Sequence, residues 1–243
     1  MRRLTSPDRM KLINEKNILK IVHENPGIYR KLIAEKTNLS SQTVTNLVTE
    51  LVERRVLLEY APSLGIKGRN PVSLSVNYSG FYMITADINI GRVAVYVNAL
   101  DETVIASEER PVGQKTDVLN VLKEMIGQVL ERAGTVRTIL ACAISVTGVV
   151  NEDKGIVVEA GKLNWYNLAG ELSYLGVPVL VRNDANMFAY YEKSQFPADL
   201  NFMIAKIDVG IGSAFVLGGR VLESTNNVAG ELGHVTAMAQ GAE

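Results

Sequence analysis

The sequence has a single cysteine and no long apolar segment. Cys142 lies in the apolar run TILACAISV, so it has no disulfide partner within the chain and predicts a small buried side chain in a reducing compartment. No apolar run reaches the length of about 18 residues that a membrane-spanning helix needs. The basic N-terminal residues MRRLTSPDRMKL are not followed by an apolar segment, which argues against a signal peptide. The sequence therefore predicts a cytoplasmic protein with no membrane partner.

The composition is that of a globular protein, but the charge is unevenly distributed. The 243 residues, 47% apolar and 21% charged, allow one large domain or two smaller ones. Residues 1–80 contain 13 Lys and Arg against 7 Asp and Glu, whereas residues 81–243 contain 12 against 19, within a net charge of −1. A basic N-terminal part on an acidic body indicates that only the first part meets a polyanion.

The first part predicts three short helices. Residues 14–25 place apolar side chains on one helical face, and Pro26-Gly27 ends that helix, whose His23 is expected at a partly exposed end. The segment IYRKLIAEKTN predicts a second helix, and LSSQTVTNLVTELVERR predicts a third with an apolar stripe. The second and third are joined by about three residues, which is typical of a helix-turn-helix.

The exposed side chains in the first turns of the third helix are short hydrogen-bonding groups, with no acids among them. Ser40 or Ser41 is a good N-cap for this helix. Amide and hydroxyl side chains in the first turns of a helix suit contacts to base edges and phosphates in a major groove. A solvated helix of a small bundle is the alternative, but such helices usually carry Glu and Lys there. The predicted DNA contacts on this helix are Ser40, Ser41, Gln42, Thr43, Thr45 and Asn46.

Two short strand candidates follow, VLLEY and PVSLSV, around the basic loop APSLGIKGRN. This pattern fits the hairpin wing of a winged helix, whose tip contacts a phosphate or the minor groove through Lys67 and Arg69. A plain linker is the alternative. The sequence thus predicts a winged helix-turn-helix domain over residues 1–78.

Residues 79–243 predict a mixed α/β domain, because a meander of strands is followed by strands that alternate with helices. The apolar runs TILACAISV and VPVLV are expected as buried strands. The helix after the meander should bury Val118, Leu122, Ile126 and Leu130. The remaining elements are strands at 82–87, 92–100 and 103–110, a short helix near 168–175, a helix from Asp184, and a strand pair that turns at 209–212.

Two polar motifs stand out in this domain, RNDAN at 182–186 and GELGHV at 230–235. They supply Asn183, Asp184, Glu231 and His234. Carboxylates, an amide and an imidazole at strand ends suit a polyol, because each buried sugar hydroxyl needs a hydrogen-bond partner. Ordinary turn chemistry is the alternative, since Asn-Asp is common at helix starts and Gly is common in loops.

The order of motifs along nearly the whole chain is distinctive. After the helix-turn-helix come, in turn, GRNPVSLSV, ADINIGRVAVYVNALDETVI, AISVTGVV, NWYNLAGEL, PVLVRNDAN, DVGIGSAFVLGGRVL and AGELGHV. This series resembles the ROK family of sugar-responsive repressors and sugar kinases. The resemblance implies an actin-like, ribonuclease H-like lobe of the sugar-kinase type after the winged helix. The DNA-binding domain places the chain with the repressors, such as those for xylose and N-acetylglucosamine, because the kinases lack one.

The resemblance also implies site residues. In the family, the Asn-Asp pair and the E-x-G-H motif hold the sugar, which here are Asn183, Asp184, Glu231 and His234, with Asn164 as a weaker correspondence. Family members bind zinc through the histidine of E-x-G-H and three downstream cysteines in C-x-C-G-x-x-G-C. The present chain ends at Glu243, one residue before the first of these, so we expect no complete metal site and no cofactor here. Zinc, a second sugar-binding glutamate and a second lobe would belong to a longer form, and the chain is expected to be a fragment or a truncated gene product.

The phosphate-binding motifs of the family kinases are altered. Where the kinases carry D-x-G-x-T, this chain has Asp87-Ile88-Asn89-Ile90-Gly91, which loses both the glycine and the hydroxyl. Where they carry a loop like G-T-G-I-G-G-G, residues 208–214 read DVGIGSA, which places a carboxylate at Asp208 where it would repel phosphate. The sequence therefore predicts no enzyme activity, and we expect Asp184 to accept a hydrogen bond from a sugar hydroxyl instead of acting as a base.

Three functions remain open from the sequence. The first is a sugar-responsive repressor that binds double-stranded operator DNA as a homodimer or higher oligomer. The second is an ATP-dependent sugar kinase, which leaves the N-terminal domain unexplained. The third is a DNA-binding regulator that senses nothing. The sequence names neither the sugar nor the operator.

Overall fold

In the computed structural model, contacts between residues group the chain into two compact units, Met1–Phe81 and Tyr82–Glu243. The sequence placed the domain boundary between residues 78 and 79. Within the described part of the chain, no helix is both long enough and apolar enough to cross a membrane. The structure describes residues 6–60, 72–113, 115–134, 138–160, 164–197, 199–208, 210–223 and 229–235.

The first unit is a winged helix-turn-helix, as predicted. Three helices are followed by two antiparallel strands, which confirms the hairpin of a wing, although its tip with Lys67 and Arg69 lies outside the described residues. A single 3-10 turn, η1 (Tyr78–Gly80), follows the hairpin. The elements are α1 (Ser6–Glu24), α2 (Arg30–Thr37), α3 (Ser41–Glu53), β1 (Leu57–Tyr60) and β2 (Ser73–Val76).

The core of this unit follows from the apolar stripe of α3. Val44, Val48 and Leu51 are completely buried, against residues of α1, α2 and the hairpin. Ser40 caps the helix, because its hydroxyl accepts a hydrogen bond from the backbone nitrogen of Thr43 at 3.1 Å. Burying each large aliphatic side chain contributes about 1.5–3 kcal/mol, which holds the exposed face of α3 in a fixed orientation.

Helix α1 begins eight residues earlier than the predicted start at residue 14. Its first turns leave large apolar side chains in solvent, so hydrophobic periodicity could not predict them: Met10 is 62% exposed. Ion pairs tie this segment to α3 instead. Lys11 pairs with Glu50, and Arg54 reaches both carboxylate oxygens of the buried Glu15, at 3.2 and 3.1 Å.

The second unit is built on a five-stranded sheet of order β10-β6-β3-β4-β5. The predicted meander is confirmed, since β3 (Phe81–Asn89), β4 (Arg92–Ala99) and β5 (Val104–Pro111) pair antiparallel in sequence. Strand β6 (Thr138–Val146) pairs in parallel with β10 (Val179–Asn183).

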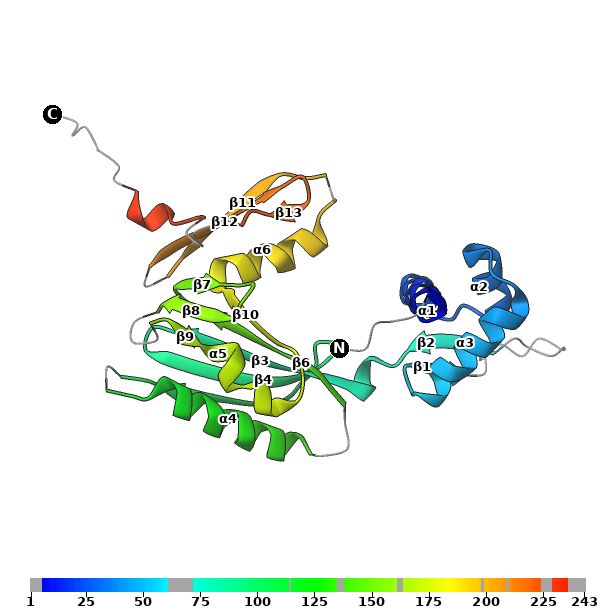
Figure 1. The fold of residues 1–243 in the computed structure, drawn as a ribbon, viewed down its shortest axis with the longest axis horizontal. Coiled ribbons are helices and arrows are strands. Elements are labelled where there is room, and N and C mark those ends of the chain that lie inside the picture. Colours follow the sequence, from blue (N-terminus) through cyan, green and yellow to red (C-terminus); the bar gives the residue numbers. More distant parts are fainter. Residues whose placement is uncertain are drawn as a thin grey trace. The chain divides into compact units, whose positions relative to one another are not determined.

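Three burial predictions in this sheet need correction. Strand β6 was expected to be buried, but Leu140 in its first half is 41% exposed, and its buried residues begin at Cys142. Strand β10 was expected to be buried, but only Val181 is fully buried, because β10 is the outermost strand of the sheet and Leu180 is 46% exposed. Helix α4 (Val118–Ala133) covers one face of the sheet (Figure 1) and buries a slightly rotated stripe. Val118 and Leu130 are only partly buried, and the fully buried side chains are Leu122, Met125, Ile126 and Val129.

Two smaller sheets complete the second unit. Helix α6 (Asp184–Gln195) packs against the three-stranded sheet of β11, β12 and β13 through Ala185, Ala189, Ala214 and Val216 (Figure 1). The predicted short helix appears as one α-turn and one 3-10 turn. The remaining elements are β7 (Val149–Asn151), β8 (Ile156–Glu159), β9 (Tyr166–Asn167), α5 (Leu168–Glu171), η2 (Ser173–Leu175), β11 (Phe202–Ile207), β12 (Ile211–Leu217), β13 (Arg220–Val221) and η3 (Leu232–His234).

Cys142 provides a probe of this core. It is completely buried in β6, and burial raises the pKa of its thiol to about 12. At pH 8 the thiol is therefore almost entirely protonated, and the thiolate is the reactive form. We expect Cys142 to resist Ellman's reagent in the native chain and to react at once in guanidinium chloride. Rapid reaction of the native protein would show that β6 is not packed as described.

Candidate functional site

Five of the six residues predicted to contact DNA from this helix lie in the first turns of α3, and Ser40 precedes them as its N-cap, but they are not equally free. The hydroxyls of Ser40 and Thr43 lie 2.8 Å apart in the N-cap. Thr45 donates its hydroxyl to the carbonyl of Ser41 at 2.8 Å, one turn back. Gln42 and Asn46 remain exposed and are joined to each other, because the amide nitrogen Nε2 of Gln42 donates to Oδ1 of Asn46 at 2.8 Å.

The second unit contains a cleft of about 320 Å³ that brings together four of the five predicted sugar-binding residues. Asn183 and Asp184 come from the end of β10 and the start of α6, whereas Glu231 and His234 come from the segment around η3. Asn164 is exposed and is not among the lining residues. The other described residues that line the cleft are Asn89, Thr147, Gly148, Lys206, Asp208, Gly210, Ile211, Gly212 and Gly233.

Asn183, which was predicted to bind the sugar, also caps a helix. It is the N-cap of α6, and its Oδ1 accepts from the backbone nitrogen of Asn186 at 3.1 Å. Its amide nitrogen donates to the carbonyl of Gly148 at 2.9 Å. The side chain is therefore held rigidly at the cleft, and one acceptor lone pair and one amide proton remain for a ligand.

Asp184 is 5% exposed, and three contacts leave one acceptor site on Oδ1 for a ligand. Its Oδ1 accepts from the backbone nitrogen of Ala185 at 2.9 Å. Its Oδ2 accepts from the hydroxyl of Thr147 at 2.7 Å and forms a 2.6 Å ion pair with Nζ of Lys206. The carboxylate thus lies at the cleft wall with a fixed orientation and a neutralising cation.

Lys206 was not predicted as a site residue, although the sequence holds a signal for it. It belongs to β11, where Phe202 and Ile204 face inward toward α6 and alternate with exposed residues. The alternation places Lys206 on the same inward side. A lysine on the buried side of an apolar strand needs an anionic partner, because burying an unpaired charge is costly. That partner is Asp184.

Asn89 and Asp208 close a ring of contacts around this ion pair. The amide nitrogen of Asn89 donates to Oδ2 of Asp208 at 3.3 Å, and Nζ of Lys206 lies 3.7 Å from the same oxygen. The hydroxyl of Thr147 lies 3.1 Å from Oδ1 of Asn89, so its single proton serves either Asn89 or Asp184. We call these five residues the polar ring; it links the ends of β3, β6 and β11 to the start of α6.

Asp87, the aspartate kept from the kinase motif, is also engaged. Its Oδ2 accepts from Nη2 of Arg92 at 2.9 Å, and Nη1 of Arg92 lies 3.2 Å from Glu109. Burial alone would lower the pKa of Arg92, but the carboxylates of Glu109 and Asp87 raise it above its usual value. The arginine is therefore a permanent cation, and it holds the aspartate on the surface of the meander.

The GELGHV segment lies against β12 by backbone contacts that require glycine. Ser213 donates both its backbone nitrogen and its hydroxyl to the carbonyl of Gly230, at 3.0 and 2.7 Å. Gly230 has φ +90°, and a Cβ there would lie 1.9 Å from the carbonyl oxygen of Ser213. At Gly233 a Cβ would lie 2.5 Å from the carbonyl oxygen of Ile211. These two glycines let the segment approach the sheet edge of the cleft.

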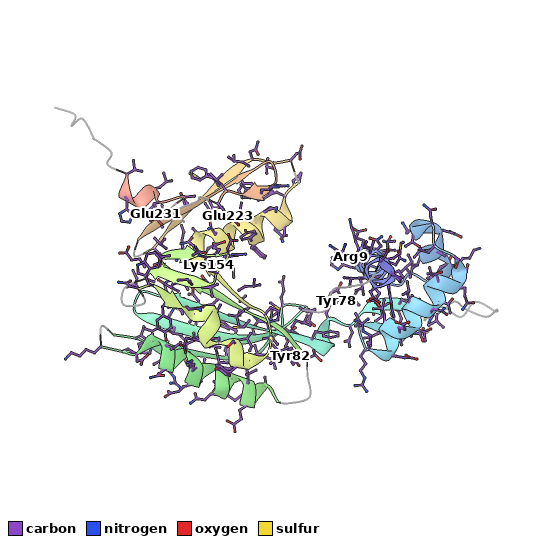
Figure 2. All side chains as sticks on the ribbon, viewed as in Figure 1. Arg9, Tyr78, Tyr82, Lys154, Glu223 and Glu231 are labelled. Carbon is purple, nitrogen blue, oxygen red and sulfur yellow. The ribbon has the colours of Figure 1, made fainter. Side chains whose placement is uncertain are left out.

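Glu231 and His234 were expected at a strand end. Instead, Glu231 immediately precedes the 3-10 turn η3, and His234 is the last residue of that turn (Figure 2 labels Glu231). The side chain of His234 is 84% exposed, and its Nε2 lies 3.7 Å from Oε2 of Glu231. After Gly230 the backbone bonds within the segment itself, since the nitrogens of Leu232 and His234 donate to the carbonyls of Gly230 and Glu231, at 2.8 and 3.2 Å.

A zinc site does not fit the residues that the structure describes. Zinc in proteins takes about four ligands, commonly Cys and His. The described residues hold no cluster of three or more His, Cys, Asp or Glu side chains placed to bind a metal, and Cys142 is buried in β6. His234 therefore has no described co-ligands for a metal.

The comparisons with known proteins agree with this architecture. Residues 85–243 match the model of the ROK family, and residues 12–57 match a winged helix-turn-helix DNA-binding model. The chain belongs to the ROK family. Its fold class is thereby confirmed, with a winged helix-turn-helix before an actin-like lobe of the sugar-kinase type.

Similar proteins include named repressors. The xylose repressor of Staphylococcus xylosus is 29% identical over 233 residues, which are 93% of this chain and 61% of the repressor. The N-acetylglucosamine repressor of Escherichia coli O6:H1 is 22% identical and is covered over 58% of its length, against 94% of this chain. The chain thus spans about 60% of the length of these curated relatives.

The similar solved structures include both a transcriptional regulator and a sugar kinase of the ROK family. A ROK family transcriptional regulator, described as a homolog of the E. coli MLC protein, superposes with a TM-score of 0.76 at 28% identity, over 97% of this chain and 62% of that one. A ROK family glucokinase from Streptomyces griseus superposes with a TM-score of 0.56 at 20% identity, over 66% of this chain and 52% of the kinase. The second likeness shows a shared fold alone.

Proposed function

We propose that this chain is a sugar-responsive transcriptional repressor that binds double-stranded operator DNA. The observation that carries the proposal is the presence, in one chain, of a winged helix with an uncharged polar recognition face and of a cleft that gathers Asn183, Asp184, Glu231 and His234. The similarity to named xylose and N-acetylglucosamine repressors supports it.

D-xylose is the effector we propose first, since several of the relatives are xylose repressors. A pentose offers several hydroxyls, each of which needs a partner when buried. The cleft supplies acceptors from Asp184 and Glu231, both donor and acceptor capacity from Asn183, and an imidazole from His234. N-acetylglucosamine is the natural comparison, because its amide needs a further donor and acceptor.

We expect two copies to act together in the cytoplasm. A single helix-turn-helix buries too little surface for tight specific binding, so such proteins usually read two half-sites with two-fold symmetry. Coupling to the sugar then requires that D-xylose bind one arrangement of the copies better than the other.

The experiment is selection from a pool of randomised DNA duplexes by the 243-residue chain, followed by sequencing. A repressor should enrich one pseudo-palindromic sequence, and light scattering of the complex should give two chains per duplex. Enrichment of no sequence would contradict the proposal.

The contacts of the altered kinase motifs support a protein without phosphoryl transfer. Asp87 is paired with Arg92, and Asn89 is bonded to Asp208 where a kinase needs open backbone to cradle phosphates. We predict no sugar-dependent ATP hydrolysis above background with D-xylose, D-glucose or N-acetylglucosamine. A coupled assay for ADP, with a ROK glucokinase as positive control, measures this. Formation of a sugar phosphate would instead favour the kinase alternative.

A further inference from the structure

The contacts on α3 separate residues that cap the helix from residues that are free to read DNA. Ser40 and Thr43 are bonded to each other at the N-cap, and the hydroxyl proton of Thr45 is used by the carbonyl of Ser41. Among the six polar residues of this face, Gln42 and Asn46 alone carry amides, which combine a donor and an acceptor in one plane. Both are exposed.

The bond between these two amides makes them one unit. Nε2 of Gln42 donates to Oδ1 of Asn46 at 2.8 Å across one helical turn. Such a pair at positions i and i+4 restrains both side chains before DNA arrives, so less side-chain freedom is lost on binding. The bond uses the donor of Gln42 and the acceptor of Asn46. The two groups left wholly free are the acceptor Oε1 of Gln42 and the donor Nδ2 of Asn46.

We propose that the Gln42–Asn46 pair reads one adenine in the major groove of each half-site, an inference that rests on the proposed DNA-binding function. Adenine presents a donor at N6 beside an acceptor at N7, whereas guanine presents acceptors at both O6 and N7. The Oε1 of Gln42 accepts from N6 and the Nδ2 of Asn46 donates to N7. A guanine at that position would set O6 against Oε1, and a pyrimidine offers no N7.

The first arm of the test repeats the duplex selection with variants of the full chain. The wild type should prefer adenine at one position of each half-site by about fivefold or more over guanine. Gln42→Met, which keeps the length of the side chain, should lose this preference, because only the contact of Oε1 with N6 distinguishes adenine from guanine. Asn46→Ala should instead lose the preference for a purine over a pyrimidine, because N7 is present in both purines. Thr49→Val is the matched control, because Thr49 is exposed on α3 about one turn beyond Asn46 and is not among the predicted DNA contacts; it should keep both preferences.

The second arm changes single atoms of the base in the enriched duplex. 7-Deazaadenine removes the N7 acceptor, so it should weaken the wild type and leave Asn46→Ala unaffected. Purine, which lacks the 6-amino group, should weaken the wild type and leave Gln42→Met unaffected. This pattern assigns one atom of the base to each side chain, which a loss of helix stability would not do.

The outcomes separate the two claims. If the wild-type chain enriches no sequence, the proposed DNA-binding function fails, and the inference fails with it. If a sequence is enriched but Gln42→Met keeps its preference for adenine over guanine, the chain binds DNA and the adenine assignment is overturned. Equal sensitivity of wild type and Asn46→Ala to 7-deazaadenine would overturn it as well.

Discussion

Replacing Asp184 with alanine should weaken D-xylose binding about ten- to a hundredfold and leave binding to the enriched duplex unchanged. The carboxylate is the most deeply buried acceptor of the cleft, and a sugar hydroxyl left without its partner costs about 1–3 kcal/mol. The change also leaves the ammonium of Lys206 without its 2.6 Å partner, which disturbs the polar ring further. Isothermal calorimetry with D-xylose measures the effect.

Two further variants make this result interpretable. Asp184→Asn keeps the shape of the side chain but removes its charge, so it should fall between the wild type and the alanine variant. Glu131→Ala, an acid-to-alanine change on the exposed side of α4, should bind D-xylose like the wild type. Equal D-xylose affinity for Asp184→Ala and wild type would remove Asp184 from the proposed site, provided that both melt in one transition.

Gly230→Ala is the second change with a large expected effect, and we expect it to abolish the sugar response. A methyl group at this position would lie 1.9 Å from the carbonyl oxygen of Ser213, and the backbone is at φ +90°. The segment must therefore leave β12, and it takes Glu231 and His234 out of the cleft. Because this segment contributes little to the core of either unit, DNA binding should persist.

Gly218→Ala is the matched control for this prediction. Gly218 also has a positive φ, +54°, but a Cβ there meets no atom of the described residues within 4 Å. Alanine at this position therefore costs about 1 kcal/mol in backbone strain but collides with no described atom. D-xylose titrations should show a normal response for Gly218→Ala and none for Gly230→Ala. A normal response from both would mean that the position of this segment against β12 does not matter.

The sequence was sufficient for elements whose side chains repeat along the chain. The stripe of Val44, Val48 and Leu51 predicted α3, and a cap at Ser40 or Ser41 predicted its start, because both signals are local; the structure selects Ser40. The start of α1 at Ser6 was missed because ion pairs with α3, not apolar burial, hold its first turns. The exposure of β10 was missed because a strand's place in a sheet depends on its neighbours.

Only part of the cleft could be predicted, because sequence motifs mark residues that are close along the chain and not those that meet only in the fold. Its four motif residues lie in two short segments, and the family resemblance marked both. The polar ring could not be predicted, because Asn89 and Asp208 meet across 119 positions and Lys206 reaches Asp184 across 22. Asp208 was predicted to repel phosphate; the structure shows that it accepts a hydrogen bond from Asn89, the other altered position.

The most direct test of the account is the effect of D-xylose on the affinity of the 243-residue chain for its enriched duplex, followed by fluorescence anisotropy. L-xylose is the control, because it has the same groups in mirror-image arrangement. The account predicts that D-xylose weakens DNA binding with a saturable dose dependence and that L-xylose does not. Tight DNA binding that D-xylose leaves unchanged at every concentration would contradict it and would favour a DNA-binding regulator that senses no sugar.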